Sequence, residues 1–246
     1  MPLPTPPDNA TTDRILGGRV LYRQPRLGFR AALDPVLLAA AVPACPGDRV
    51  LEGGTGAGAA LLCLAARVPG LIGTGIDRDP AMVRLAQENA ALNVWPGLTF
   101  VAADLAASPV RGQFDHAFAN PPYHAPDGTA SPVAAREAAK RGAHDLLAVW
   151  AAALSGPLRH RGTLTLILPP GLLETALTAL RAAGSPCERL VPIWTAKGRP
   201  ARWVVVRGRK NGRTPLAIAP GLVLHDASRG FSPGAEAILR GGGPLE

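Results

Sequence analysis

A tetrapeptide at residues 120–123 combines groups that could hold an amine against a reaction partner. It reads Asn120–Pro121–Pro122–Tyr123 and directly follows an apolar segment. Two consecutive prolines cannot donate the hydrogen bonds of a central strand, so the chain must leave a sheet here. The amide oxygen of Asn120 and the backbone carbonyl of Pro121 can each accept one N–H of an exocyclic amine, and Tyr123 could stack on a planar base. This chemistry is positioning and electrostatics, and it requires no titrating base.

A glycine cluster at residues 52–58, Glu-Gly-Gly-Thr-Gly-Ala-Gly, could hold a cofactor. Glycines permit positive φ and a close approach of the backbone, and the helix predicted to follow presents free N–H groups. Gly54 and Gly56 also fit the dinucleotide-binding pattern, and Asp77 at the end of the next predicted strand would suit a ribose in either case. Glu52 would repel a pyrophosphate, whereas it suits a ligand with an ammonium group.

For other polar residues near these segments, the sequence gives weaker indications of a functional role. Asp104 ends a predicted strand and could accept from an adenine amine, although a helix cap or turn would use the same residue type. His116 lies within a predicted strand and His124 in a predicted loop, so we expect a catalytic role for neither. The 3 cysteines form no Cys-x-x-Cys pair, so neither a metal site nor a disulfide is expected.

Four features follow one another along the chain: the glycine cluster at 52–58, Asp77, Asp104 and the tetrapeptide 120–123. Together they resemble the successive motifs of class I S-adenosylmethionine-dependent methyltransferases of the amino-methylating branch. The resemblance covers about residues 46–206. It implies S-adenosylmethionine as the cofactor, and it implies catalytic roles for Asn120, Pro121 and Tyr123. The cofactor-binding residues that it implies are Glu52, Gly54, Gly56, Asp77, Asp104 and Asn120. The sequence departs from the family at two positions, because the family usually has Asp at position 52 and a bulkier residue at position 53.

The terminal segments 16–20, 24–30, 34–41 and 237–242 are similar to those of bacterial tRNA (adenine-N6)-methyltransferases that act beside the anticodon of valine tRNA. The resemblance implies methyl transfer to the N6 of an adenine in RNA, with tRNA favoured. Glutamine methyltransferases of peptide release factors remain an alternative, because a carboxamide NH2 poses the same geometric problem. RNA guanine-N2 and DNA adenine methylation also remain open. A NAD-dependent oxidoreductase is disfavoured by Glu52, and a non-catalytic RNA-binding module is a third reading.

Strands that alternate with helices must position these residues, which predicts a doubly wound α/β fold with a mostly parallel sheet. The family implies seven strands with the last one antiparallel, in agreement with a hairpin expected between the final two. Asp34 is expected to cap the first helix, with Pro35 in its first turn. Residues 124–143 are expected to form a long loop. The expected strands are 49–52, 71–77, 98–102, 114–119, 163–168, 189–194 and 202–206, and the expected helices are 33–42, 59–68, 80–93, 145–159 and 171–183.

Length, composition and charge limit the number of domains, the location and the partners that we expect. At 246 residues and 47% hydrophobic content, the chain suits one domain at 14–246, with its cofactor-binding core at about 46–206, after a disordered segment at 1–13. Residues 207–246 are expected to form a basic loop and a partly ordered tail. The sequence has no long apolar segment or signal peptide, which predicts a cytoplasmic protein without membrane contact. The net charge of +8 favours RNA as partner, with Arg207, Arg209 and Lys210 as expected contacts.

Overall fold

The structure is a computed structural model of the chain, and it describes residues 10–26, 33–107, 110, 112–122, 132–226 and 230–245. For residues 132–141, 143 and 144 it describes the backbone only. Tyr123 and His124 lie outside the described residues, as do residues 27–30 of the segment 24–30.

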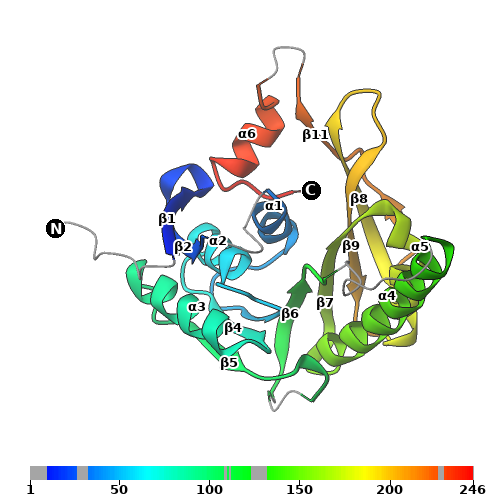
Figure 1. Cartoon of the computed structure of the whole chain (residues 1–246), viewed down its shortest axis with the longest axis horizontal. Coiled ribbons are helices and arrows are strands. Elements are labelled where there is room, and N and C mark those ends of the chain that lie inside the picture. Colours follow the sequence, from blue (N-terminus) through cyan, green and yellow to red (C-terminus); the bar gives the residue numbers. More distant parts are fainter. Residues whose placement is uncertain are drawn as a thin grey trace.

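A twisted sheet of nine strands forms the centre of the molecule (Figure 1). The strand order is β10-β8-β9-β7-β6-β3-β4-β5, and β11 also pairs with β8. All pairs are parallel except those of β9, which runs antiparallel to both β7 and β8. The seven expected strands are therefore present, and the last of them is the antiparallel one. The strands are β3 (Arg49–Gly53), β4 (Ile72–Asp77), β5 (Leu98–Ala102), β6 (Phe114–Ala119), β7 (Leu158–Leu168), β8 (Cys187–Ala196), β9 (Ala201–Arg209), β10 (Ala217–Ile218) and β11 (Leu222–His225).

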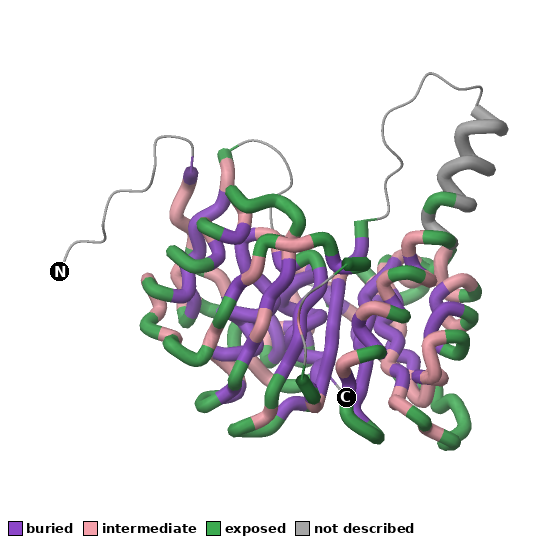
Figure 2. Tube along the Cα trace, turned by 90° about the horizontal axis from the view of Figure 1, so that it is seen from below, coloured by how far each residue is buried: buried purple, intermediate pink, exposed green. Residues whose placement is uncertain are grey.

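Helices cover both faces of this sheet, as a doubly wound fold requires. One apolar cluster joins the sheet to α1 (Asp34–Ala41), α2 (Ala59–Arg67), α3 (Pro80–Leu92) and α6 (Pro233–Leu239). A second cluster, on the other face, joins it to α4 (Pro132–Ser155) and α5 (Leu173–Ala182). The strands between the two layers are largely buried, whereas most connecting turns are exposed (Figure 2). Of the helices in the described chain, none combines the length and the apolar composition needed to cross a bilayer.

An N-terminal hairpin packs beside the main sheet without joining it. Its strands are β1 (Ala10–Ile15) and β2 (Val20–Pro25), separated by the 3-10 turn η1 (Leu16–Gly18). Asn89, fully buried on α3, accepts a hydrogen bond from Arg23 N at 2.8 Å and donates to Arg23 O at 2.8 Å. Asn93 makes the same pair of bonds with Leu21, at 2.9 and 2.7 Å. On the edge of β2 that does not pair with β1, two side-chain amides thus make the backbone hydrogen bonds that a further strand would make.

The C-terminal segment closes against this N-terminal hairpin. Arg19 Nη1 donates to Gly241 O at 2.7 Å, and Leu245 N donates to Ala40 O at 2.8 Å. Gly17, at a φ of 64°, lies so close to the carbonyl of Arg240 that a Cβ would approach its oxygen to 2.5 Å. Of the terminal segments that carry the family resemblance, 16–20, 34–41 and 237–242 are therefore neighbours in space.

Three expectations about chain segments are wrong in part. The loop expected at 124–143 ends by Pro132, because α4 begins there and runs through Gly142. Four alanines in its first turns favour helix more strongly than one glycine opposes it. Strand β1 begins at Ala10, inside the segment expected to be disordered, and residues 1–9 lie outside the described residues. The tail after Arg209 forms two short strands and a helix, because it continues the sheet edge along β8 and packs α6 on α1.

Candidate functional site

The glycine loop and Asn120 lie at the point where the chain reverses its direction of travel across the sheet. From β3 the chain proceeds outward to β4 and β5, and it then returns to β6 on the other side of β3. Glu52 is paired with Phe118, and Gly53 with Ala119, so the loop after β3 and the turn after β6 begin at the same level. Open α/β sheets bind ligands at this kind of switch point, outside the carboxyl ends of the strands.

The conformation of the glycine loop requires glycine at three positions. Gly54, Gly56 and Gly58 have φ values of 65°, 53° and 89°, which other L-residues rarely adopt. Nothing lies within 4 Å of a Cβ built on Gly56, so its backbone faces open space. At Gly54, by contrast, a Cβ would lie 2.5 Å from the Trp150 ring of α4. Gly56 therefore permits a ligand to approach the backbone of the loop, whereas Gly54 permits the Trp150 ring to pack against the loop. The contact with Trp150 was not predicted from the sequence.

Glu52 is a buried acid, 4% exposed, at the end of β3. Its Oε2 accepts a hydrogen bond from Thr55 Oγ1 at 2.6 Å. Burial raises the pKa of Glu52 to about 8, and this effect outweighs the hydrogen bonds that favour the charged form. A carboxyl in this condition gains most from a cationic partner.

Gly53 explains one departure from the family pattern. A Cβ at this position would lie 2.9 Å from Leu105 Cδ2 and 3.2 Å from Leu154 Cδ2. Both leucines belong to the apolar cluster on the α4 side of the sheet, and Leu154 is fully buried. In this chain the two leucines occupy the space that a bulkier residue would need.

Asp77 and Asp104 complete the acidic half of the site, but each also has a local task. Asp77 Oδ2 accepts from Gly56 N at 2.8 Å and Oδ1 from Asp79 N at 3.0 Å, so it fixes the glycine loop. Each oxygen retains a second lone pair for a ligand hydroxyl. Asp104 is exposed, and its Oδ1 accepts from Ala106 N at 2.9 Å, which is the turn role named as its alternative.

Asn120 has a partner that the sequence did not reveal. Its Nδ2 donates a short hydrogen bond to Asp34 Oδ2, whereas its Oδ1 receives none from the residues that the structure describes. Asp34 was expected to cap α1, but Leu33 occupies the cap position and makes no side-chain cap bond. Burial raises the pKa of Asp34, against the lowering effects of its hydrogen bonds and of nearby Arg202. The carboxyl thus reaches across the fold to Asn120, besides a backbone hydrogen bond within its own residue. Pro121, next to Asn120, is buried, and Tyr123 lies outside the described residues.

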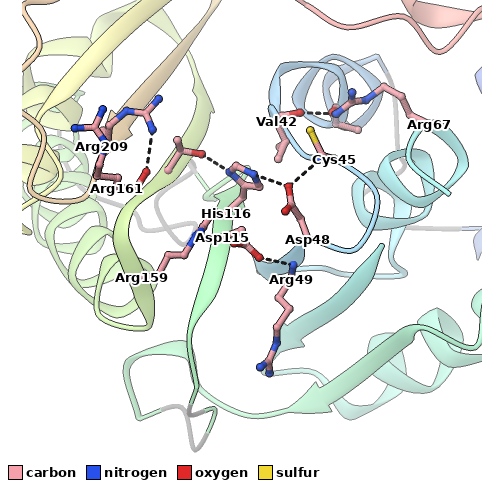
Figure 3. A network of polar contacts seen from close by, with 12 residues as sticks. Val42, Cys45, Asp48, Arg49, Arg67, Asp115, His116, Arg159, Arg161 and Arg209 are labelled. Atoms are coloured by element: carbon pink, nitrogen blue, oxygen red, sulfur yellow. Dashed lines mark hydrogen bonds and ion pairs between the residues drawn. The ribbon is translucent and has the colours of Figure 1, made fainter. Parts of the chain in front are cut away.

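His116 belongs to a polar network at the opposite, amino end of the strands (Figure 3). Its Nδ1 and Nε2 lie 2.8 Å from Thr163 Oγ1 and 3.2 Å from Asp48 Oδ2. Asp115 joins the same network, with Arg49 N at 2.7 Å and Arg159 Nε at 2.6 Å. Burial lowers the pKa of His116. The network ties together the first residues of β3, β6 and β7, and it is remote from Asn120.

The three cations expected to contact RNA also lie toward that end. Since β9 is antiparallel, Arg209 is level with Thr163, four residues or about 13 Å below the level of Asn120. Arg209 donates to both oxygens of Glu188, at 2.5 and 2.7 Å, and Arg207 Nε lies 3.6 Å from the same carboxylate. Lys210 Nζ donates to Ser155 O at 2.8 Å. Their charges are therefore engaged within the chain, away from the site.

A cavity of about 580 Å³ also lies at the amino ends of the strands, lined by residues that include Arg19, Leu71, Trp95 and Leu98. Its lining contains neither an acid nor a nucleophile, so we do not regard it as the reaction site. Among the side chains that the structure describes, no three His, Cys, Asp or Glu residues gather into a group able to hold a metal ion.

Comparison of the chain with known proteins identifies its family. Residues 33–148 match the family described as Methyltransferase small domain. The tRNA1(Val) (adenine(37)-N6)-methyltransferase of Actinobacillus succinogenes is 31% identical over 185 residues, which are 74% of this chain and 77% of that protein. The chain belongs to this methyltransferase family. It is an enzyme of the methyltransferase class, and the mixed α/β sheet with one antiparallel strand is the fold of that class.

The chain is also similar to other methyltransferases. The release factor glutamine methyltransferase of Rhodospirillum rubrum is 42% identical over 118 residues, but the match spans 45% of this chain and 36% of that protein. Among solved structures, TrmN from Thermus thermophilus has a TM-score of 0.54 at 25% identity and covers 72% of this chain and 47% of that one. A predicted O-methyltransferase from Agrobacterium tumefaciens has a TM-score of 0.69 at 23% identity, over 86% of this chain and 97% of that one. This last similarity shows the fold alone.

Proposed function

We propose that the protein transfers a methyl group from S-adenosylmethionine to the N6 of an adenine in tRNA. One observation carries the choice of an NH2 group as the methyl acceptor: Asn120 donates from its Nδ2 to the carboxylate of Asp34. An ionised carboxylate can only accept a hydrogen bond, so the NH2 group of the Asn120 amide must face Asp34. Its Oδ1 then points away from Asp34 and is left to accept a hydrogen bond from a ligand. An acceptor fixed at a strand end, across from the glycine loop, is what an NH2 group needs.

The residues around the glycine loop fit the proposed cofactor. S-adenosylmethionine carries an ammonium group, for which the buried carboxyl of Glu52 is a suitable partner. Asp77 holds the loop and has free lone pairs for ribose hydroxyls, and the backbone at Gly56 is open to a ligand. We assign Asp104 to the adenine end. When bound, the cofactor would supply the electrophilic methyl group of its sulfonium, and the neutral thioether would be the leaving group.

The protein contributes orientation to the reaction. An exocyclic amine is a poor nucleophile while its lone pair is delocalised into the ring. Asn120 Oδ1 accepts one N–H and Pro121 O accepts the other, so that the lone pair is directed away from the ring plane and toward the glycine loop. The same two acceptors stabilise the positive charge that develops on nitrogen, and one N–H proton leaves to solvent after transfer. Tyr123 stacks on the base, a contribution of about 1–3 kcal/mol.

The tRNA substrate is supported by relatives that match most of the chain. Besides the Actinobacillus protein, the tRNA1(Val) (adenine(37)-N6)-methyltransferase of Dickeya chrysanthemi is 28% identical over 87% of this chain and 88% of its own length. An adenine in a tRNA loop can be splayed out into a slot of this kind, and a tRNA substrate is consistent with a cytoplasmic enzyme. A release factor glutamine remains the second candidate, because the shorter match to that branch has the higher identity, 42%.

Labelled S-adenosylmethionine distinguishes these substrates. The purified protein is incubated with bulk tRNA from cells that lack it, or with purified release factors. We expect label in tRNA, and nucleoside mass spectrometry should then identify N6-methyladenosine. Label in protein alone would exclude the RNA substrate, and label in N2-methylguanosine would retain RNA but exclude adenine. Asn120→Ala serves as the inactive control in every arm.

A further inference from the structure

The carboxyl edge of the sheet, where Asn120 lies, is divided by charge. The half formed by β3, β4 and β5 carries four acids at or just after its strand ends, Glu52, Asp77, Asp79 and Asp104, against one cation, Arg78, between two of them. On the other side of β6, the hairpin between β8 and β9 carries only cations: Lys197, Arg199 and Arg202. Asn120 follows β6, which stands between the two halves in the strand order. A cationic cofactor suits the first half, and a polyanion suits the second.

We propose that the β8–β9 hairpin, residues 195–202, is the surface that grips the phosphate backbone of the RNA substrate. This inference rests on the proposed function and names the surface that serves it. Strand register places the hairpin: Asn120 is level with Ile167, Ile167 pairs with Val205, and Val205 pairs with Val191. The turn begins after Ala196, five residues or about 16 Å beyond that level. In Figure 1 the hairpin extends past the end of β6, and β11 runs beside it, with His225 level with Ala196.

The hairpin cations are available to a ligand, in contrast to those near Glu188. Lys197, Arg199 and Arg202 are exposed, and none forms an ion pair with any residue that the structure describes. Arg202 lies with its guanidinium 5.3 Å from the centre of the Trp203 ring, which holds it at the strand end. Two exposed acids, Glu174 and Asp226, also lie at this end of the sheet, but outside the hairpin, and Asp226 already has a partner within the chain.

Geometry connects this surface to the reaction site. Two strand spacings, or about 10 Å, separate β6 from β9 across the sheet. Burial raises the pKa of Asp34, the partner of Asn120, and the charge of Arg202 is among the effects that oppose this rise, so Arg202 acts on the site electrostatically. Lys197 and Arg199 lie farther out, at a height of about 16–20 Å, which spans about five or six stacked nucleotides at 3.4 Å each. A target base held at Asn120 therefore leaves its flanking phosphates within reach of the hairpin.

Salt dependence of tRNA binding tests the proposal with a matched pair of variants. Lys197→Gln/Arg199→Gln removes two hairpin charges, and Arg181→Gln/Arg213→Gln removes two exposed charges at the opposite end of the sheet. We expect the hairpin variant to weaken tRNA binding roughly tenfold or more at low salt and to reduce the slope of log K against log salt by about two. The control variant should leave both unchanged. An unchanged slope in the hairpin variant, or an equal loss in the control, would overturn the proposal.

Lysine footprinting gives an independent measurement without substitution. The chain has only three lysines, of which Lys197 lies in the hairpin and Lys210 beside Ser155 at the other end. With tRNA bound, acylation of Lys197 should fall severalfold while that of Lys210 stays constant; protection of Lys210 but not Lys197 would contradict the proposal. Failure of the wild-type protein to methylate tRNA would refute the proposed function instead. If release factor is methylated and its binding alone depends on the hairpin, RNA is the wrong partner.

Discussion

Asn120 Nδ2 donates a hydrogen bond to Asp34 Oδ2, across 86 positions of sequence. The bond joins the turn after β6 to the first turn of α1, whose eight residues are all buried. An asparagine amide has two faces of similar size and opposite hydrogen-bonding character. By occupying the NH2 side, Asp34 determines that the carbonyl side of Asn120 meets the ligand.

Replacing Asp34 should therefore impair turnover more than binding. Asp34→Asn preserves volume but can donate or accept, so it no longer imposes one orientation on Asn120. We expect kcat to fall about 10- to 100-fold, as for other small misplacements of a catalytic group, with little change in cofactor Kd. Steady-state kinetics with calorimetry would separate the two. Asp34→Glu, which keeps the charge, should recover part of kcat; if both variants lose activity equally, the role of Asp34 is structural.

The pH profile gives a second measurement on Asp34. Its pKa is raised by burial, and protonation would let the carboxyl donate to Asn120 Oδ1 and so block the acceptor. Activity should decline as the pH falls toward that raised pKa, and this acid limb should be absent from Asp34→Asn.

Asn120→Ala should abolish methyl transfer while cofactor binding largely survives. The substitution removes one of two acceptors for the amine, and such a loss reduces kcat by about 100- to 1000-fold. Asn120→Asp is the informative companion, because its carboxylate would face that of Asp34 and lose the donor. We expect it to be at least as inactive as the alanine variant. Substantial turnover by Asn120→Ala would instead favour a non-catalytic role for this turn.

Glu52 should make cofactor binding depend on pH. In the free protein burial raises its pKa from 4.5 to about 8, so that the carboxyl is mostly protonated at pH 7. An ammonium group beside it favours the charged form, so binding releases a proton and affinity should rise up to tenfold per pH unit from about pH 6 to about 8. Calorimetry in buffers of different ionisation enthalpy would count the proton. A pH-independent affinity would exclude Glu52 as the ammonium partner.

The same shift has the opposite effect on the free protein. Because the folded pKa lies above the ordinary value, the contribution of Glu52 to stability is complete below pH 4.5 and is lost as the pH rises through about 8. The loss is at most about 1.4 kcal/mol per pH unit. Glu52→Gln should be more stable than wild type at pH 8 without cofactor, and it should bind cofactor more weakly.

Asn89 should matter to both stability and cofactor affinity. Besides its two bonds to Arg23, it donates to Ala57 O of the glycine loop at 3.0 Å. Asn89→Leu leaves these buried backbone groups without partners, which should cost about 2–4 kcal/mol and loosen the loop. Asn93→Leu is the matched control, since Asn93 binds β2 in the same way but does not contact the glycine loop. If both variants lose stability and neither loses cofactor affinity, the bond to Ala57 does not serve the site.

The sequence by itself determined the order and type of the main elements. Strands and helices from Arg49 to Val206 alternate with clear periodicity, and Pro121 with Pro122 marks the end of a strand by removing two N–H donors. The antiparallel end was predictable because the connection between the last two strands is too short for a crossover. The residues of the glycine loop and the acids of the next strands were identified for the same reason: their spacing along the chain is what places them at one edge.

Tertiary structure decided which polar groups meet. Asp34 has the same local signature as a helix cap, and only the packing of α1 against α2 and β7 brings it to Asn120. Likewise Arg207 and Arg209 are cations in an acid-free segment of the sequence, but the antiparallel direction of β9 carries them to Glu188, whereas Arg202 lies at the carboxyl end of the sheet. Local propensity depends on neighbours along the chain, whereas hydrogen bonds and ion pairs depend on distance in space. The partners of buried charges are therefore fixed by the fold, at sequence separations that no local pattern encodes.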